Sequence, residues 1–327
     1  MSYGSRKEAL LNEYKGNLFE FLVSKEISHL FSFEVQFLSQ FDQKAFETLT
    51  QQEDFIRNFF PEYLEFLPMS AKYCAQKLIN VLDVNSCQGV EVVGKMQASK
   101  SNQETYSEVD LILKCKSDIN CSLKLSRQSS FVNTKSAGIK SFFEKYFQYK
   151  DISNIQAGFT FDWNLEYEIF ARNLHKAIDL EYTQLFENWQ QNRSEVLPGE
   201  LNQDLKLILY DFYEKMNEKL SKILQELYHR DKDQFKKSLM PLIGFSKSNI
   251  VQVCLFYTKK QQSLTCKEIQ VHAWDDVLKA LDSELIFKVN KTNIEICSMG
   301  LTIQIRMKPM NTFIQKGYKV NCSVKFN

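Results

Sequence analysis

Glycine and proline are scarce in this chain, with 10 and 5 copies among 327 residues. That scarcity excludes collagen-like and low-complexity sequences, which are rich in both. No apolar run approaches the roughly 18 residues that a membrane-spanning helix requires. The first residues, Met1 to Glu8, contain neither an apolar core nor a small-residue cleavage site, so no signal peptide is indicated. We therefore expect a soluble cytoplasmic protein.

The eight cysteines contain no C-x-x-C pair, and the four histidines lie far from them in the sequence. Structural zinc sites need closely spaced thiolate or imidazole ligands, so this pattern does not indicate zinc. Disulfides are rare in cytoplasmic proteins. We expect reduced, mostly buried thiols with a structural role.

The formal net charge is +1, but the charges are unevenly distributed. Residues 114–150 carry eight basic and two acidic side chains, and residues 286–327 carry seven basic and one acidic. Residues 151–245 between them carry 16 acidic and 11 basic side chains. A single basic run is usually a solvated face. Two such segments favour a nucleic-acid-binding surface.

Hydrophobic residues make up 44% of the chain, enough for a large core. Their spacing of three and four residues predicts helices through residues 6–82, with breaks at Pro61 and Pro68. A helix is also predicted over 138–149, and mostly helix over 160–237. Residue-by-residue alternation predicts an antiparallel meander over 90–126 and further strands from residue 250 onward, with a short helix near 277–281.

These patterns predict an α+β (mixed α/β) fold in three consecutive parts. Residues 1–150 form a core of helices around a small sheet, and residues 151–245 form a helical region. Residues 246–327 form a second, strand-rich region.

An aspartate and a lysine stand on neighbouring predicted strands of the meander. Asp110 opens one strand, in Ser107-Glu108-Val109-Asp110-Leu111-Ile112-Leu113, and Lys124 lies on the next, in Ser122-Leu123-Lys124. Facing residues of paired strands lie about 5 Å apart, so pairing brings the two side chains together. Upstream, a predicted helix contains Lys15-Gly16-Asn17-Leu18-Phe19-Glu20.

This arrangement resembles the PD-(D/E)xK nuclease superfamily, to which many type II restriction endonucleases belong. In that family's pattern, an Asp and a following (Asp/Glu)-x-Lys lie on adjacent strands, and an upstream helix often donates a Glu. The resemblance covers about residues 10–150. It implies a restriction-endonuclease-like core, a small mixed sheet flanked by helices, in which Asp110, Lys124 and Glu20 are catalytic.

Phosphodiester hydrolysis explains these residue types. A divalent ion neutralises the scissile phosphate and lowers the pKa of a bound water, and Mg²⁺ prefers oxygen ligands. The resemblance implies Mg²⁺, with Mn²⁺ as a substitute, held by Asp110, Glu20 and the backbone carbonyl of Leu123. Lys124 would hold or deprotonate the attacking water and stabilise negative charge.

The sequence departs from the family pattern at Ser122, which stands where the second acidic residue is expected. Some branches of the superfamily tolerate such a residue, and Glu20 would then be essential for metal binding. Glu108 is a second candidate for the missing carboxylate. The alternative is a protein that binds DNA but cuts it slowly or not at all.

A polar and basic run follows Lys124 and ends at the helix predicted from residue 138. It is similar to a run in some restriction-enzyme-like families, and Ser136 is expected to cap that helix, whose N-terminal amides favour anions. We expect this loop and a basic strand near residue 306 to contact DNA. The residues expected to do so are Arg127, Asn133, Lys135, Ser136, Lys140, Arg306 and Lys308.

The sequence and this resemblance thus predict a Mg²⁺-dependent endonuclease for double-stranded DNA. Many enzymes of the resembled family dimerise so that two active sites address both strands of a palindromic site, and the resemblance implies a homodimer here. The first alternative is a catalytically weak or inactive DNA-binding protein on the same scaffold. The second is a helical interaction protein that uses the acidic middle segment and has no nucleic-acid role. No phosphate-binding glycine-rich loop is present, so nucleotide-dependent chemistry is not indicated.

Overall fold

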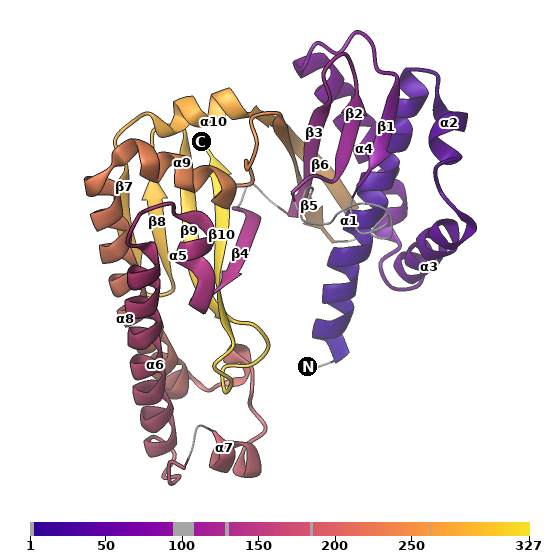
Figure 1. Ribbon diagram of the computed structural model, residues 1–327. Coiled ribbons are helices and arrows are strands. Elements are labelled where there is room, and N and C mark those ends of the chain that lie inside the picture. The colour runs from indigo at the N-terminus through magenta and orange to yellow at the C-terminus, as the bar shows by residue number, and fades with distance from the viewer. Residues whose placement is uncertain (1–2, 94–107, 128–130, 184–185, 262) are drawn as a thin grey trace. The chain divides into compact units, whose positions relative to one another are not determined.

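The computed structural model describes residues 3–93, 108–127, 131–183, 186–261 and 263–327. The fold is α+β, as expected, with two five-stranded sheets flanked by helices (Figure 1). The chain divides into two units, each formed by two separate segments. Unit 1 comprises Met1–Val132 and Gly244–Val277, and unit 2 comprises Asn133–Ile243 and Leu278–Asn327.

Unit 1 contains a mixed sheet, here called sheet A, and the N-terminal helices. Its elements are α1 (Tyr3–Leu30), α2 (Glu34–Leu38), α3 (Gln43–Phe59), α4 (Glu62–Val81), β1 (Gly89–Val92), β2 (Leu111–Lys114), β3 (Ile119–Arg127), β5 (Ile250–Lys260) and β6 (Ser263–Ala273).

The helices of unit 1 follow the predicted periodicity, with one exception. In α1, Leu11, Leu18 and Val23 lie in the core, and α3 begins after Asp42, whose carboxylate accepts a hydrogen bond from the Ala45 amide at 2.9 Å. The expected break at Pro68 is wrong, because Pro68 lies inside α4. Neighbouring α4 residues are buried in the core. This burial outweighs the cost of an internal proline, about 3 kcal/mol.

Sheet A has the strand order β1-β2-β3-β5-β6. Strands β1, β2 and β3 form the expected antiparallel meander, β5 pairs in parallel with β3, and β6 returns antiparallel to β5. A parallel neighbour needs a long crossover, and residues 133–243 lie within this one. Each paired β5 residue faces a β3 residue 130 positions earlier, for example Cys254 and Lys124.

Unit 2 contains a second sheet, here called sheet B, with the order β4-β10-β9-β8-β7. Helix α8 packs against β7, β8 and β9. The remaining elements of the chain are β4 (Val132–Gly138), α5 (Phe142–Tyr146), α6 (Ile152–Lys176), α7 (Glu187–Asn192), α8 (Gln203–Arg230), α9 (Lys232–Leu242), α10 (Trp274–Leu281), β7 (Ile286–Asn290), β8 (Asn293–Cys297), β9 (Leu301–Pro309) and β10 (Tyr318–Phe326).

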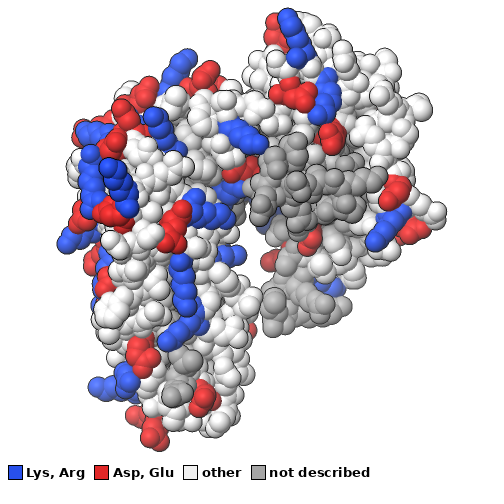
Figure 2. All heavy atoms as spheres, in the orientation of Figure 1, with Lys and Arg blue, Asp and Glu red and all other residues white. Residues whose placement is uncertain are grey.

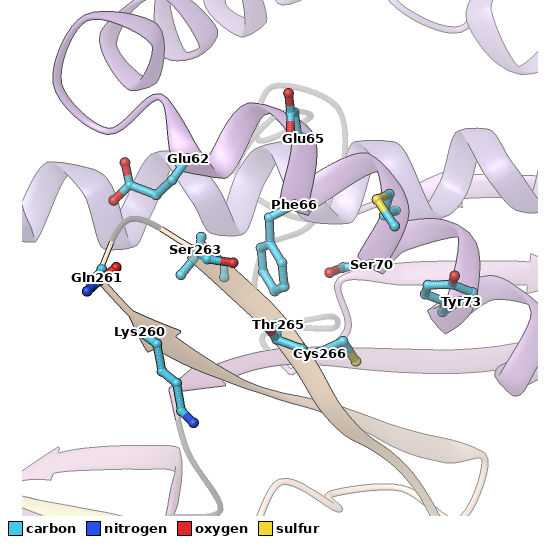
Figure 3. A pocket seen from close by; sticks show the side chains of 12 residues that line it. Glu62, Glu65, Phe66, Ser70, Tyr73, Lys260, Gln261, Ser263, Thr265 and Cys266 are labelled. Atoms are coloured by element: carbon cyan, nitrogen blue, oxygen red, sulfur yellow. The ribbon is translucent and has the colours of Figure 1, made fainter.

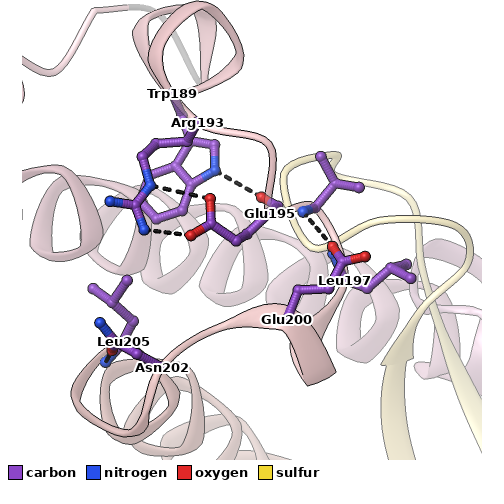
Figure 4. Close-up of polar contacts among 8 residues, drawn as sticks. Trp189, Arg193, Glu195, Leu197, Glu200, Asn202 and Leu205 are labelled. Atoms are coloured by element: carbon purple, nitrogen blue, oxygen red, sulfur yellow. Dashed lines mark hydrogen bonds and ion pairs between the residues drawn. The ribbon is translucent and has the colours of Figure 1, made fainter. Parts of the chain in front are cut away.

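Local polar contacts hold the segment that leads into α8 (Figure 4). The Arg193 guanidinium pairs with the Glu195 carboxylate and lowers its pKa. The Glu200 carboxylate accepts two backbone amides just before it, each at 2.9 Å. The Asn202 side chain accepts the Leu205 amide at 3.0 Å, which caps the helix.

Three expectations from the sequence, about the division into regions and about residues 128–149, need correction. The three consecutive regions are replaced by two interleaved units, because β5 and β6 join sheet A rather than a C-terminal sheet. The expected loop after Arg127 contains strand β4, so Ser136 lies in a strand and caps no helix; residues 128–130 lie outside the described residues. The helix expected over 138–149 is only a 3₁₀ turn followed by α5. Pairing of β4 with the distant β10 decides this local structure.

All eight cysteines are free thiols, as expected, and five of them are buried. In the part of the chain that the structure describes, no helix is long and apolar enough to cross a membrane.

Candidate active site

Asp110 lies immediately before β2, and main-chain hydrogen bonds fix it between two strands. Its amide donates to the Cys121 carbonyl of β3 at 2.9 Å, and its carbonyl accepts from the Val93 amide, next to β1, at 3.0 Å. Both main-chain polar groups of Asp110 are therefore hydrogen-bonded, as in a strand residue. Its side chain is 19% exposed.

One oxygen of the Asp110 carboxylate, Oδ2, faces three donors on β3. The Leu123 amide donates to it at 2.6 Å, and the Ser122 hydroxyl and the Lys124 ammonium lie at 3.4 and 3.5 Å. The pairing of β2 with β3 ends at Leu111 and Cys121. The carboxylate thus accepts a strand amide just beyond the end of the main-chain pairing.

Lys124 is charged at neutral pH. Burial lowers its pKa, but the neighbouring charges of Asp110 and Glu20 outweigh this effect, and the net shift is upward. Because the pKa is raised, the side chain remains an ammonium. As an ammonium it can donate hydrogen bonds to a water or a phosphate oxygen.

Glu20 comes from α1, far from the hairpin in sequence, and is partly exposed. The amphipathic pattern of α1 positions it, because its preceding neighbours Leu18 and Phe19 are buried in the core. Its charge raises the pKa of Lys124, so the two side chains belong to one electrostatic cluster with Asp110. This cluster has two carboxylates and one ammonium.

The donor set matches a cation that keeps most of its water. Among the described residues no group of three or more His, Cys, Asp or Glu side chains is placed to hold a metal ion. Mg²⁺ is often bound by only one or two carboxylates, with water and substrate phosphate completing its coordination. Asp110 supplies one such carboxylate, and Glu20 is the second that the resemblance implies, whereas a structural zinc site would need four protein ligands.

Ser122 and Glu108, the other two candidate site residues, each have a hydrogen-bond partner. Ser122 is buried and neutral, and its hydroxyl points to Asp110. The Glu108 carboxylate accepts the Ser246 amide at 2.9 Å, at the approach to β5. Leu123, whose carbonyl is the third expected ligand, is buried in β3 between Ser122 and Lys124.

A row of polar residues continues from Asp110 across sheet A, and sequence reasoning missed it. Ser122 pairs with Gln252 on β5, which pairs with His272 on β6. Gln252 is fully buried. Burial lowers the pKa of His272 to about 4, so its imidazole is neutral at neutral pH. No local motif marks these residues, because only strand pairing brings them beside Asp110.

In unit 2, three of the residues expected to bind DNA, Arg306, Lys308 and Asn133, lie on the polar side of sheet B. On β9, Arg306 and Lys308 alternate with buried residues, and Lys308 faces Lys319 on β10. Burial and the charges of Arg306 and Lys319 lower the pKa of Lys308. Arg306 donates to Asn133 of β4 at 3.4 Å. These three cations and an amide form one polar, basic surface, here called the β9–β10 surface.

The other residues expected to bind DNA are more dispersed. Lys135 lies in β4, two residues after Asn133, and Lys140 lies in the 3₁₀ turn that follows. Arg127 ends β3 in unit 1. On the side of unit 2 that carries α8 and α9, Figure 2 shows basic and acidic side chains interspersed. Such mixed charge is typical of a solvated helical surface.

No family model, no curated protein and no solved structure matches this chain. Its chemistry is therefore argued from the residues themselves. The Asp110 carboxylate and the Lys124 ammonium lie 3.5 Å apart, and the charge of Glu20 acts on the same ammonium. This combination suits reactions in which negative charge develops on oxygen.

Proposed function

We propose that this protein is a Mg²⁺-dependent endonuclease that hydrolyses phosphodiester bonds in double-stranded DNA, similar in its active site to type II restriction endonucleases. One observation carries the proposal. Lys124 on β3 lies 3.5 Å from the Asp110 carboxylate beside β2, and the charge of Glu20 on α1 acts on the same ammonium. These are the three residue types that the resemblance to the PD-(D/E)xK superfamily implies, and their charges support the proposal.

Each residue has a distinct role in this proposal. Asp110 and Glu20 would hold Mg²⁺ with the Leu123 carbonyl, and the bound ion supplies Lewis-acid chemistry to the scissile phosphate. Lys124 donates to the attacking water or to the phosphate and stabilises the charge that develops on oxygen.

The β9–β10 surface supports the DNA part of the proposal. Arg306, Lys308 and Lys319 lie close enough for two of them to lower the pKa of the third. Cations held together in this way repel each other, and a polyanion relieves the repulsion by neutralising them. We assign this surface to contacts with the phosphate backbone, which fix position rather than sequence.

Plasmid cleavage tests the proposal. The parent chain should nick or linearise supercoiled plasmid in Mg²⁺ or Mn²⁺ and not in EDTA, and Lys124→Ala should reduce the rate at least ~100-fold. The matched control is Lys114→Ala. Lys114 is an exposed lysine of β2 that pairs with Asp118 at 2.9 Å. Equal rates for Lys124→Ala and the parent would refute the site.

Ser122 favours the second candidate, a DNA-binding protein with weak or no cleavage. That candidate predicts salt-sensitive retention on DNA without nicking in either metal. Ser122→Glu adds a carboxylate to the row beside Asp110, where it would repel Asp110 unless a cation lies between them. If the protein binds Mg²⁺ here, this variant should gain a larger Mg²⁺-dependent rise in melting temperature than the parent.

A further inference from the structure

Strand β6 forms one edge of sheet A, and no strand among the described residues pairs with its outer side. The strand is long, with 11 residues, and most of its side chains are only partly buried or exposed. An edge strand presents unpaired N–H and C=O groups that can pair with another strand. The side chains of β6 indicate which strand could pair with its outer edge.

A bulge in β6 sets which way its residues face. Phe256 and Tyr257 of β5 face Glu268 and Cys266, so Lys267 between them has no partner on β5. Lys267 and Glu268 together occupy one position of the strand. The apolar residues on the two sides of the bulge therefore pack on the same face, against the core of unit 1: Leu264, Cys266, Ile269 and Val271.

The opposite face of β6 is polar beyond the bulge. The Gln270 amide donates to the Glu268 carboxylate at 2.9 Å, and His272 Nε2 lies 3.2 Å from Gln270 Oε1. Before the bulge, Ser263 and Thr265 are exposed. Apolar and polar positions are therefore arranged symmetrically about the Lys267–Glu268 pair.

We propose that β6 pairs antiparallel with β6 of a second copy of this chain, about a two-fold axis at the bulge. In this register Cys266 faces the partner subunit's Ile269, and Leu264 faces the partner subunit's Val271. Lys267 faces the partner subunit's Glu268, and the two-fold repeats each contact. Apolar residues meet apolar residues, and opposite charges meet at the centre, each cross-strand pair contributing favourably.

The bulge is what permits this match. In a regular strand, Cys266 and Ile269 would lie on opposite faces of the sheet, because successive side chains alternate. The extra residue puts both on the core face. A two-fold through the Lys267–Glu268 pair then keeps every facing pair on the same side of the sheet.

A groove beside β6 adds a second observation (Figure 3). It has a volume of about 620 Å³ and runs between α4 and the β5–β6 hairpin. Phe66, Met69 and Tyr73 of α4 line it, and Met69 and Tyr73 are 58% and 51% exposed. Large apolar side chains exposed beside an open strand edge are typical of a surface that another chain covers. In the proposed dimer, the two copies of α4 lie on the same side of the joined sheets.

Charge reversal tests the register. We would measure the mass of the full chain, 38.4 kDa as a monomer, by sedimentation equilibrium over a range of concentrations. Lys267→Glu places four carboxylates at the two-fold, and Glu268→Lys places four ammonium groups there. Each should weaken dimerisation by about tenfold or more, because facing like charges repel. The double exchange Lys267→Glu/Glu268→Lys should restore it.

Lys116→Glu is the matched control, since it makes the same charge change in the β2–β3 loop, away from β6. It should leave the dimer unchanged. If the unsubstituted chain stays monomeric at every concentration, the proposal is wrong. Lys267 would then be a charged side chain that prevents the edge strand from pairing with other chains. Equal weakening by the Lys116 variant, or no rescue by the double exchange, would refute this register.

Disulfide trapping gives an independent readout. Ile269→Cys places a thiol opposite the native Cys266 of the partner subunit, at a spacing that a disulfide can bridge. Mild oxidation should produce a covalent dimer that reductant dissolves, and Cys266→Ala/Ile269→Cys should not form it. A covalent dimer that forms equally well without Cys266 would contradict the proposed pairing. Both tests measure the oligomeric state and not cleavage. Their failure would therefore refute the β6 pairing without bearing on the nuclease proposal, and an absence of cleavage would not bear on the β6 pairing.

Discussion

Removing the Asp110 carboxylate should lower the free energy of unfolding of unit 1, and the size of this loss can be estimated from the contacts that the carboxylate makes. In Asp110→Ala the Leu123 amide loses an acceptor at 2.6 Å. An unsatisfied donor in a buried position costs about 1–3 kcal/mol. The ion pair with Lys124 adds at most about 1 kcal/mol, because the two side chains are 19% and 26% exposed and water screens the pair. We expect a total loss of about 1–4 kcal/mol in the free energy of unfolding.

Asp110→Asn separates the structural from the chemical role of this side chain. Its amide oxygen can still accept the Leu123 amide, so we expect a loss of only about 1 kcal/mol. Plasmid cleavage should nevertheless fall as far as in Asp110→Ala, because the negative charge that holds Mg²⁺ is gone. A folded Asp110→Asn variant that cleaves at the parental rate would contradict the proposed metal site.

Urea unfolding followed by circular dichroism at neutral pH measures these differences. Asp118→Ala is the control, since that carboxylate also bonds a lysine, Lys114 at 2.9 Å, but is 48% exposed. It should change the unfolding free energy by less than about 0.5 kcal/mol. If Asp110→Ala and Asp118→Ala unfold alike, the contacts of Asp110 do not stabilise the hairpin and our reasoning fails.

Two further predictions concern pH and packing. Burial lowers the pKa of His272 from its usual 6.5 to about 4 in the folded protein. Between pH 6.5 and 4 this imidazole therefore binds a proton in the unfolded chain but not in the folded one, and the free energy of unfolding falls as the pH is lowered through this range. The parent should lose about 1–3 kcal/mol more than His272→Gln over this range, measured by urea unfolding at each pH, and equal slopes would contradict the burial of His272. In unit 2, Gly300→Ala should cost about 1–3 kcal/mol, because its Cβ would lie 2.6 Å from Ala280 Cβ. Gly199→Ala meets nothing within 4 Å, so equal melting temperatures for the two variants would contradict the packing of α10.

Much of the secondary structure follows from local sequence. The three- and four-residue spacing in α1 and α8 and the alternation in β9 and β10 are patterns that one segment carries by itself. The errors occur where a distant partner decides. Pro68 stays helical because α4 is packed into a core, and residues 132–138 form a strand because β10 lies beside them.

The candidate site divides in the same way. Asp110 and Lys124 are 14 residues apart on one hairpin, so local pairing was enough to predict their approach. Gln252 and His272 complete the polar row only because β5 pairs with a strand 130 residues earlier. No spacing in the sequence marks such a pairing.

The sequence by itself determined the fold class and the positions of most helices and strands, because periodicity and composition act over a few turns of chain. Only the tertiary structure decided that β5 and β6 complete the first sheet, that the chain forms two interleaved units and that β6 is left as a symmetric edge. Those features depend on hydrogen bonds between backbone groups far apart in the chain, and backbone groups are the same in every residue except proline. A local pattern therefore cannot specify their partners.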